Sequence, residues 1–136
     1  MTHKTIATHN GNFHADDVFS VAALKSIFPC AALIRTRNLD TISNADIVVD
    51  VGGEYDAEKD LFDHHQRGGA GKRENGIPYS SFGLIWKKYG LAVCKDNQEV
   101  ANIVDRELVS AIDAIDCGHV EGIYQGISLS QTISMF

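Results

Sequence analysis

The sequence is poor in cysteine and shows no regular cysteine spacing. Its three cysteines, Cys30, Cys94 and Cys117, are an odd number and form no C-x-x-C pair. This pattern argues against a disulfide framework and favours a reducing compartment. Residues 1–7 lack a long apolar run, so the sequence predicts neither a signal peptide nor a membrane span. The expected location is therefore the cytoplasm.

Positive charge is also scarce. Twelve lysines and arginines stand against 18 aspartates and glutamates, and the net charge is −6 at pH 7. Such a surface repels nucleic acid, which argues against a protein that coats DNA without sequence preference. An anionic substrate would have to be attracted by bound metals and a few placed arginines. The length of 136 residues and the 44% of apolar residues fit a single globular domain, without repeats or low-complexity segments.

The apolar residues predict strands alternating with helices. Short β-branched or apolar runs predict strands, and apolar residues at helical spacing predict helices. The expected elements are, in order, 6–8, 16–28, 31–34, 47–51, 80–89 and 96–116. Their order is typical of an α/β fold with a mostly parallel sheet flanked by helices. Residues 66–78 are expected to form a mobile loop, and 123–136 show no clear period.

Metal-type ligands stand at the edges of these apolar segments. They are His9, His14, Asp16, Asp50, Asp63, His64, His65, Asp113 and Asp116. Because ligands bind outside the carboxyl ends of parallel strands, we expect several of these side chains to meet at one site. Neutral imidazoles mixed with carboxylates suit Mn²⁺, Mg²⁺ or Fe, whereas a structural zinc site favours thiolates. This chemistry indicates an oxygen-rich substrate, with phosphate as the leading candidate.

The first two groups of ligands also have an ordinary structural interpretation. Asp16 and Asp17 would accept backbone N–H groups at the first turn of a helix, although such capping requires neither His9 nor His14. Asp50 after its buried strand is costly to desolvate unless it is paired or bound to a cation. A solvated strand end is the alternative for Asp50.

The later groups leave similar alternatives open. Asp63, His64 and His65 form either a polar turn or a site in which Asp63 orients a ligating imidazole and the adjacent imidazole reaches a substrate phosphate. Asp113 and Asp116 lie roughly on one side of a helix. Counting 100° per residue places Asp116 nearer the apolar stripe, which favours Asp116 as a ligand and leaves Asp113 as a supporting or solvated residue.

The glycine-rich segment 68–73 superficially resembles a phosphate-binding P-loop. The pattern fails because Arg73 stands where Ser or Thr is required and Gln66 stands where the first glycine is required. A flexible surface loop is the ordinary interpretation. In the functional interpretation, Arg67, Lys72 and Arg73 swing over an anionic substrate.

Four stretches of the chain together resemble a known group of enzymes. They are Thr8–Asp17, Asp46–Gly53, Phe62–Gly68 and Asp113–Gly118. In this order they resemble the DHH phosphoesterase superfamily, and within it the melanocyte proliferating gene (Myg-type) family. His14 stands where the wider superfamily has an aspartate.

The resemblance implies a DHH-type N-terminal domain that holds two divalent metal ions, usually Mn²⁺, with Mg²⁺ as the alternative. His9 and His14 would hold one ion, Asp16, His64 and Asp116 the other, and Asp50 would bridge the two. His65 and Arg67 would contact the scissile phosphate as the catalytic residues. From their positions in the sequence, Asp63 and Asp113 are expected to support the ligands.

The implied function is metal-dependent hydrolysis of phosphodiester bonds, as a 3′–5′ exonuclease on short nucleic acid. A pyrophosphatase or a cyclic-dinucleotide phosphodiesterase would use the same metal chemistry. The alternative from another class is a non-catalytic metal-binding module or a truncated, inactive fragment. Peptidase chemistry has no support, because the sequence contains no His-Glu-x-x-His helix.

The resemblance also bears on domain organisation and partners. Family members are longer, and a second domain follows the catalytic one, so residues 1–136 are expected to be the metal-binding catalytic domain alone, as a fragment or a minimal form. The expected partner is a nucleic acid or nucleotide substrate and not a membrane. The sequence leaves the formation of a homo-oligomer open.

Overall fold

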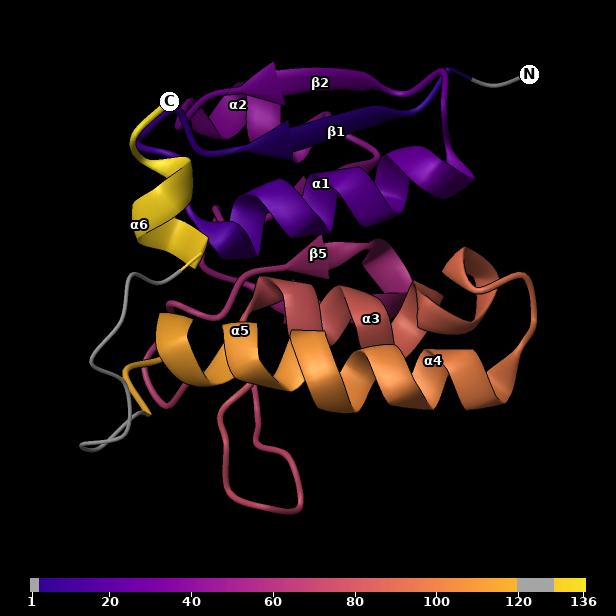
Figure 1. Ribbon diagram of the computed structural model, residues 1–136. Coiled ribbons are helices and arrows are strands. Elements are labelled where there is room, and N and C mark those ends of the chain that lie inside the picture. The colour runs from indigo at the N-terminus through magenta and orange to yellow at the C-terminus, as the bar shows by residue number, and fades with distance from the viewer. Residues whose placement is uncertain (1–2, 120–128) are drawn as a thin grey trace.

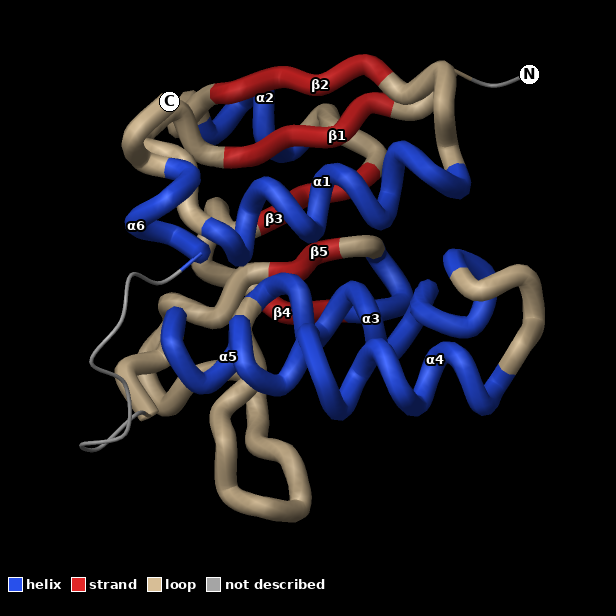
Figure 2. The backbone as a smooth tube through the Cα atoms, viewed as in Figure 1, coloured by secondary structure: helices blue, strands red, loops and turns tan. Residues whose placement is uncertain are grey.

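A five-stranded sheet lies at the centre of the computed structural model, which describes residues 3–119 and 129–136 (Figures 1 and 2). The strands are β1 (Thr5–Thr8), β2 (Ala32–Arg35), β3 (Ile47–Val49), β4 (Tyr55–Asp56) and β5 (Leu61–Phe62). Their order is β2-β1-β3-β5-β4, and all neighbours are parallel except β4 and β5.

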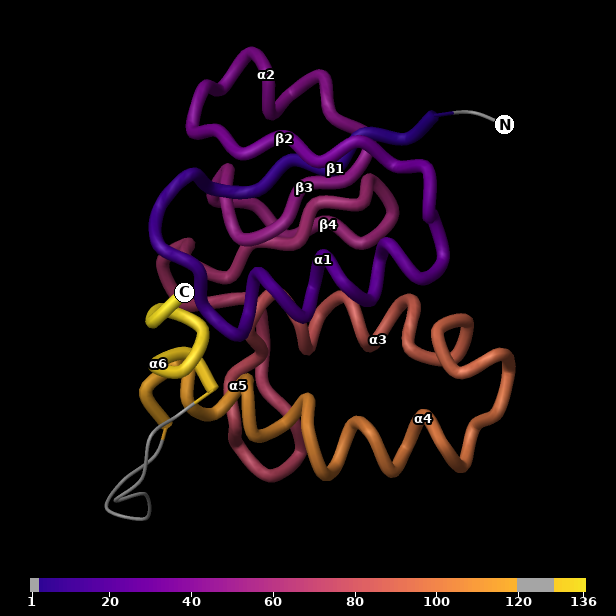
Figure 3. The backbone as a smooth tube through the Cα atoms, turned by 45° about the horizontal axis from the view of Figure 1, so that its top comes forward, coloured from indigo at the N-terminus to yellow at the C-terminus, as the bar shows by residue number. Residues whose placement is uncertain are grey.

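Helices cover both faces of this sheet. They are α1 (Ala15–Ile27), α2 (Leu39–Ser43), α3 (Ser81–Val93), α4 (Gln98–Val104), α5 (Ser110–Asp116) and α6 (Leu129–Ile133), with a 3₁₀ turn at Ala57–Lys59 and a π-helical segment at Asp105–Val109. Helices α1 and α3 pack side by side against one face, and α4 and α5 lie outside them (Figures 1 and 3). The α/β prediction is therefore confirmed.

Strand β3 is buried on both of its faces. Ile47 and Val49 face the core that α1 and α3 share, where they join Leu24 and Ile85. Val48 points to the opposite face, in a smaller apolar cluster with residues of α2. Burial on both faces explains why this strand reads as a continuous β-branched run rather than an alternating one.

The strand order creates a switch point between β1 and β3. The chain leaves β1 through α1 to β2 on one side, and then returns through α2 to β3 on the other side of β1. Connections that diverge from neighbouring strands leave a crevice at their carboxyl ends, where α/β proteins bind ligands. His9 and Asp50 directly follow β1 and β3, so the topology places both residues at this crevice.

The helix predicted over 96–116 is interrupted by the π-helical segment Asp105–Val109. A π-helical turn contains more residues than an α-helical turn. The residues that follow it therefore face other directions than a count of 100° per residue predicts. The prediction that Asp116 lies nearer the buried stripe than Asp113 is consequently wrong. Asp113 is fully buried and Asp116 is half-buried, while Val100 and Ile103 on the expected stripe are each 42% exposed.

The C-terminal residues contain a helix that the sequence did not predict. Residues 123–128 of the expected aperiodic tail lie outside the described residues, and α6 follows them. The hydroxyl of Ser130 accepts a hydrogen bond from the amide of Ala15 at 2.9 Å. Helix α6 therefore lies against the first turn of α1, as Figure 3 shows.

Asp46 ties the start of β3 to the start of β1, and this contact predicts a pH dependence of stability. The amide and hydroxyl of Thr5 donate hydrogen bonds to Asp46 Oδ2 at 2.7 and 2.9 Å, which holds the pKa of this carboxyl below its ordinary value of 3.8. A carboxyl with a lowered pKa contributes stability above its unfolded pKa and loses it as the pH falls through the folded pKa.

Asp46→Asn should therefore unfold at lower urea concentration than the unaltered protein at pH 7. The difference should shrink at pH 3, below the ordinary pKa of 3.8, because Asp46 then takes up a proton in the unfolded state. Urea unfolding of both proteins at the two pH values measures this, and all other carboxyls cancel in the comparison. A difference independent of pH would contradict the prediction.

Candidate metal centre

Asp50 is held in an unusual backbone conformation at the end of β3. Its φ of 55° lies in the left-handed region, which aspartate tolerates better than most residues. Its amide still donates to the carbonyl of Phe62 at 2.9 Å, so β3 and β5 stay paired up to this residue. Such strain persists where the surroundings hold it, and it often marks functional positions.

The carboxylate of Asp50 lies among three imidazoles. Its Oδ1 is 3.2 Å from His64 Nε2 and 3.4 Å from His65 Nδ1, and its Oδ2 is 3.3 Å from His9 Nε2. Burial raises the pKa of Asp50, and the nearby carboxylate of Asp16 adds to this, although His64 opposes both. A buried carboxylate surrounded in this way needs a compensating positive charge.

His64 faces three carboxylates through one nitrogen. Its Nε2 lies 3.1 Å from Asp116 Oδ2, 3.2 Å from Asp50 Oδ1 and 3.5 Å from Asp16 Oδ2. The side chain is 8% exposed, and Nε2 nevertheless makes no aligned hydrogen bond. Burial alone lowers the pKa of His64, but Asp116, Asp16 and Asp50 outweigh it and raise the pKa above the ordinary value.

His9 is buried beside two carboxylates. Its Nε2 is 3.4 Å from Asp17 Oδ2 and 3.3 Å from Asp50 Oδ2, while its Nδ1 accepts the amide of Gly11 at 3.1 Å. With Nδ1 as acceptor, neutral His9 carries its proton on Nε2, toward the carboxylates. A cation at this position would have to replace that proton.

His14 stands at the N-cap position of α1 and is exposed. Its ring centroid is 6.0 Å from that of His9. Its amide donates to Asp17 Oδ1 at 2.6 Å, so Asp17 caps α1 as expected. Within the described residues, no carboxylate contacts the ring of His14. The structure therefore brings His14 beside His9 but not into the carboxylate cluster.

Asp16 and Asp113 converge on the first turn of α3. Asp16 Oδ1 accepts the amide of Phe82 at 2.7 Å, and Asp113 Oδ1 accepts the amides of Ser80 and Gly83 at 3.1 and 3.0 Å. Carboxylates at a helix N-terminus are stabilised by its free N–H groups and its dipole. The expectation that Asp16 caps its own helix is therefore wrong, because it caps α3. A Cβ at Gly83 would collide with the Asp113 carboxylate, so glycine makes this approach possible.

Asp63 orients His65 rather than His64. Asp63 Oδ1 lies 2.7 Å from His65 Nδ1, and its Oδ2 accepts the amide of Gly53 at 2.6 Å. Burial pushes the pKa of Asp63 upward, but hydrogen bonds from His65 and Gly53 outweigh it and lower the pKa. The His65 side chain is 62% exposed. The Nδ1 of His64 instead lies 3.8 Å from the sulfur of Cys117.

A cleft of about 460 Å³ opens beside these side chains. Its lining includes His9, His14, Arg37, Asp50 and His65. This volume lies in the range of pockets that hold small ligands, and imidazoles and a guanidinium contribute to its wall. Among the described residues, the groups with three potential ligand atoms within 4.8 Å of one another are Asp50, His64 and His65, and His64, Asp116 and Cys117.

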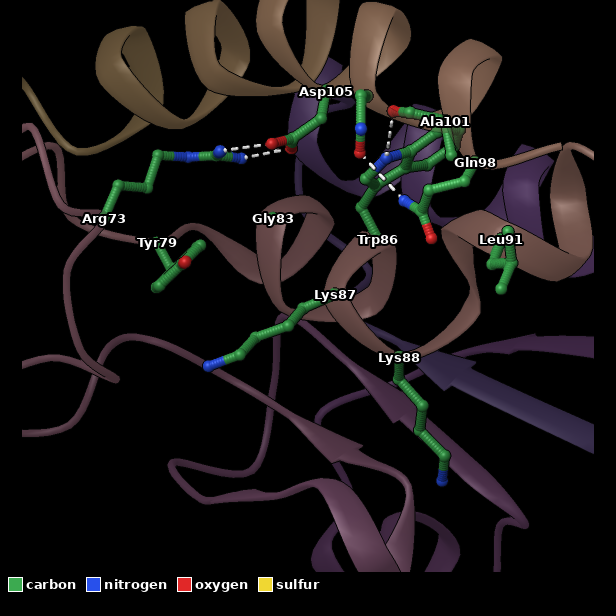
Figure 4. Close-up of a pocket in the computed structure, with 11 residues that line it drawn as sticks. Arg73, Tyr79, Gly83, Trp86, Lys87, Lys88, Leu91, Gln98, Ala101 and Asp105 are labelled. Atoms are coloured by element: carbon green, nitrogen blue, oxygen red, sulfur yellow. Dashed lines mark hydrogen bonds and ion pairs between the residues drawn. The ribbon is translucent and has the colours of Figure 1, made fainter. Parts of the chain in front are cut away.

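The arginines of the 66–78 loop behave differently from each other. Arg73 donates through Nε to Asp113 Oδ2 and through both Nη atoms to Asp105, each at 2.8 Å. Figure 4 shows its guanidinium directed at Asp105. These contacts argue against the alternative in which Arg73 swings over a substrate. Arg67 is exposed, and no side chain in the described part of the chain pairs with it.

A second cavity, of about 360 Å³, lies between α3 and α4 (Figure 4). Tyr79, Trp86 and Lys87 contribute to its wall. None of the predicted metal ligands lines it, and the Arg73 charge at its edge is neutralised by Asp105. This cavity is therefore separate from the His64 cluster.

Sequence reasoning missed three residues near the cluster. The sequence predicts a helix cap for Asp17 and predicts no place at the site for Cys117 or Arg37. Asp17 and Cys117 could have been found from the sequence because each directly follows a predicted metal ligand, Asp16 and Asp116 respectively. For Arg37, only its position after the second strand could have indicated a place at the site. Its approach to the cleft depends on how the β2–α2 connection folds back.

The fold and the cluster define an α/β domain with imidazoles and carboxylates gathered at the carboxyl ends of its parallel strands. The chain belongs to the MYG1_exonuc family, described as an uncharacterised protein family (UPF0160), whose model matches residues 5–135. No solved structure matches. Among the described residues, no helix is both long and apolar enough to cross a bilayer.

Relatives of the chain carry the same family name. The sequence is 34% identical to "MYG1 exonuclease" of Homo sapiens over 137 residues, covering 87% of this chain and 36% of the relative. It is 40% identical to "MYG1 protein YER156C" of Saccharomyces cerevisiae over 129 residues, covering 85% and 38%. It is 36% identical to "MYG1 protein C694.04c" of Schizosaccharomyces pombe, covering 87% and 37%. The chain thus spans little more than a third of these relatives.

Proposed function

We propose that this chain is the metal-binding catalytic domain of a phosphoesterase of the DHH type, which hydrolyses phosphodiester bonds in short nucleic acid from the 3′ end. The human relative is named an exonuclease, which supports nuclease activity. The observation that carries the proposal is His64 Nε2, which is buried, lacks a hydrogen bond and faces three carboxylates.

The residues of the cluster fit divalent cations. The nitrogen of His64 faces carboxylate oxygens of Asp16, Asp50 and Asp116, and such a donor set suits Mn²⁺ or Mg²⁺ better than a structural zinc. A cation there would satisfy Nε2 and relieve the mutual repulsion of the carboxylates. His9 would contribute to a second ion shared through Asp50, with His14 beside it.

Bound divalent ions would supply an activated water and stabilise negative charge on the phosphoryl oxygens. Asp63 contacts Nδ1 of His65 and so holds the imidazole in place. The Nε2 of this exposed ring is then available to contact a phosphate or to protonate a leaving oxygen. Arg67 would approach the substrate from its exposed loop. The amides in the first turn of α3 hold Asp16 in position.

The curated relatives are much longer than this chain. Because the chain spans little more than a third of these relatives, we propose that the grip of the whole protein on a nucleic acid also requires residues outside the matched region. We further propose a cytoplasmic location and leave self-association open.

Metal content and Mn²⁺-dependent hydrolysis of bis-p-nitrophenyl phosphate test the proposal together. We expect two bound ions by elemental analysis, and His64→Ala should lose a bound ion and at least about a hundredfold in turnover. The matched control is His119→Ala, because His119 is exposed and lies outside the cluster. Normal turnover in His64→Ala, or no metal in the purified protein, would overturn the proposal.

The choice of substrate separates the alternative activities. A 5′-labelled oligonucleotide should be shortened stepwise from its 3′ end, with release of nucleoside 5′-phosphates. Preferential cleavage of pyrophosphate or of a cyclic dinucleotide would assign the same centre to another phosphoesterase. Tight metal binding without any turnover would identify a non-catalytic module.

A further inference from the structure

We propose that Arg37 recognises a second phosphate of the substrate, next to the one that is cleaved. This inference rests on the proposed function and narrows its substrate class to molecules with at least two phosphates, such as an oligonucleotide end. The structure assigns this role to the β2–α2 connection, which none of the sequence motifs included.

Arg37 lies close to the imidazole of His9. A Cβ at Gly11 would lie 3.3 Å from His9 Nδ1 and 3.5 Å from Arg37 Nη2, so the imidazole and the guanidinium border the same space beside Gly11. Arg37 also lines the 460 Å³ cleft together with His65. The guanidinium is therefore near the candidate metal centre, on the side where His9 stands.

The charge of Arg37 is available to a ligand. Its neighbour Arg35 donates to the carbonyl of Gly11 and lies 4.0 Å over the ring of Phe13, so Arg35 is engaged in holding the loop after β1. Arg37 is exposed and, among the described residues, makes no ion pair. A guanidinium can bind phosphate through two parallel hydrogen bonds, which makes it suited to this contact.

The position of Arg37 favours a neighbouring phosphate over the scissile one. The scissile phosphate belongs beside Asp50 and His64, and these side chains come from β3 and from the segment after β5. Arg37 comes from the opposite side of β1, after β2. The cleft volume is that of a ligand-sized pocket, so it accommodates more than a single phosphate.

Binding of two nucleotides tests the proposal without turnover. Calorimetry in Mn²⁺ should show that the protein binds thymidine 3′,5′-bisphosphate more tightly than thymidine 5′-monophosphate. Arg37→Gln should abolish most of this preference, a loss of about tenfold or more in bisphosphate affinity, since charge-assisted hydrogen bonds are involved. Arg37→Lys should lose part of it. Arg106→Gln, which removes an exposed arginine paired with Glu107, is the control and should change nothing.

Kinetics provide the second readout. Arg37→Gln should raise KM for a 5′-phosphorylated dinucleotide about tenfold and leave kcat and the hydrolysis of bis-p-nitrophenyl phosphate unchanged. Equal losses on both substrates would mean that Arg37 contacts the scissile phosphate, and no loss on either would mean that it binds neither. Both results overturn the inference. Absence of turnover in the unaltered protein would reject the proposed function, while the binding measurement would still decide the role of Arg37.

Discussion

Asp50→Asn should abolish Mn²⁺-dependent hydrolysis while leaving the fold intact. Asparagine tolerates the left-handed backbone that Asp50 adopts, at a φ of 55°, so the turn after β3 is preserved. The substitution removes the carboxylate charge that faces His9, His64 and His65. We expect kcat/KM to fall by at least about a hundredfold, because even residues that only orient a metal ligand cost about 10- to 100-fold.

The thermal stability of the metal-free protein should not fall with activity in Asp50→Asn. Burial raises the pKa of Asp50, so its ionised form costs free energy in the folded protein at neutral pH. Asp50→Asn should not lower the midpoint of thermal unfolding in EDTA. Added Mn²⁺ should raise the midpoint of the unaltered protein but not that of the variant, since a ligand stabilises only the state that binds it.

Asp60→Asn is the matched control for this variant. Asp60 also adopts a left-handed backbone, at a φ of 59°, but its carboxylate contacts Lys88 and Tyr89, away from the cluster. It should keep full hydrolysis and a full response to Mn²⁺. Substantial activity in Asp50→Asn would mean that Asp50 does not bridge the ions.

Asp113→Ala should be among the most destabilising single substitutions in the chain. Asp113 is fully buried and accepts hydrogen bonds from Arg73, from Ser80 and from the amide of Gly83. Burial lowers the pKa of Arg73, but Asp105 and Asp113 outweigh it and raise the pKa, so the guanidinium is charged. Removing one partner of a buried ion pair costs about 3–5 kcal/mol. We expect about 3 kcal/mol in urea unfolding, because Asp105 remains as a partner.

A double-substitution cycle with Arg73→Met distinguishes the ion pair from the cap on α3. The combined variant should be less destabilised than the sum of the two single variants, since no buried charge is then left unpaired. Asp113→Asn should cost less than Asp113→Ala, because its amide oxygen still accepts from the first turn of α3. A loss below about 1 kcal/mol for Asp113→Ala, in the range of an ordinary surface change, would show that this network contributes little.

Local sequence was sufficient for the elements and for part of the site. The β-branched run at 47–49 and the helical spacing after residue 16 predicted β3 and α1 within one or two residues, because propensity and periodicity act over neighbouring positions. The same reasoning identified His9 and Asp50 as residues that follow strands. Since parallel strands end at a common edge, the closeness of His9 and Asp50 could be expected without any knowledge of the packing.

The remaining features depend on contacts between distant elements. Asp16 caps α3 rather than α1, and Asp113 shares that cap, because α1, α3 and α5 pack together in a way that no local pattern encodes. The π-helical segment changed the rotation of every residue after Val109, and Asp113 lies fully buried in the helix that follows it.

The sequence by itself determined the kind of side chains available and the strand ends at which His9 and Asp50 stand. Only the tertiary structure decided that His64 faces Asp16, Asp50 and Asp116, that Arg73 is engaged by Asp105 and Asp113, and that Arg37 borders the cleft. The physical reason is that hydrophobic patterning specifies which face of an element is buried, whereas the partner of a buried charge is fixed by the packing of whole elements against one another.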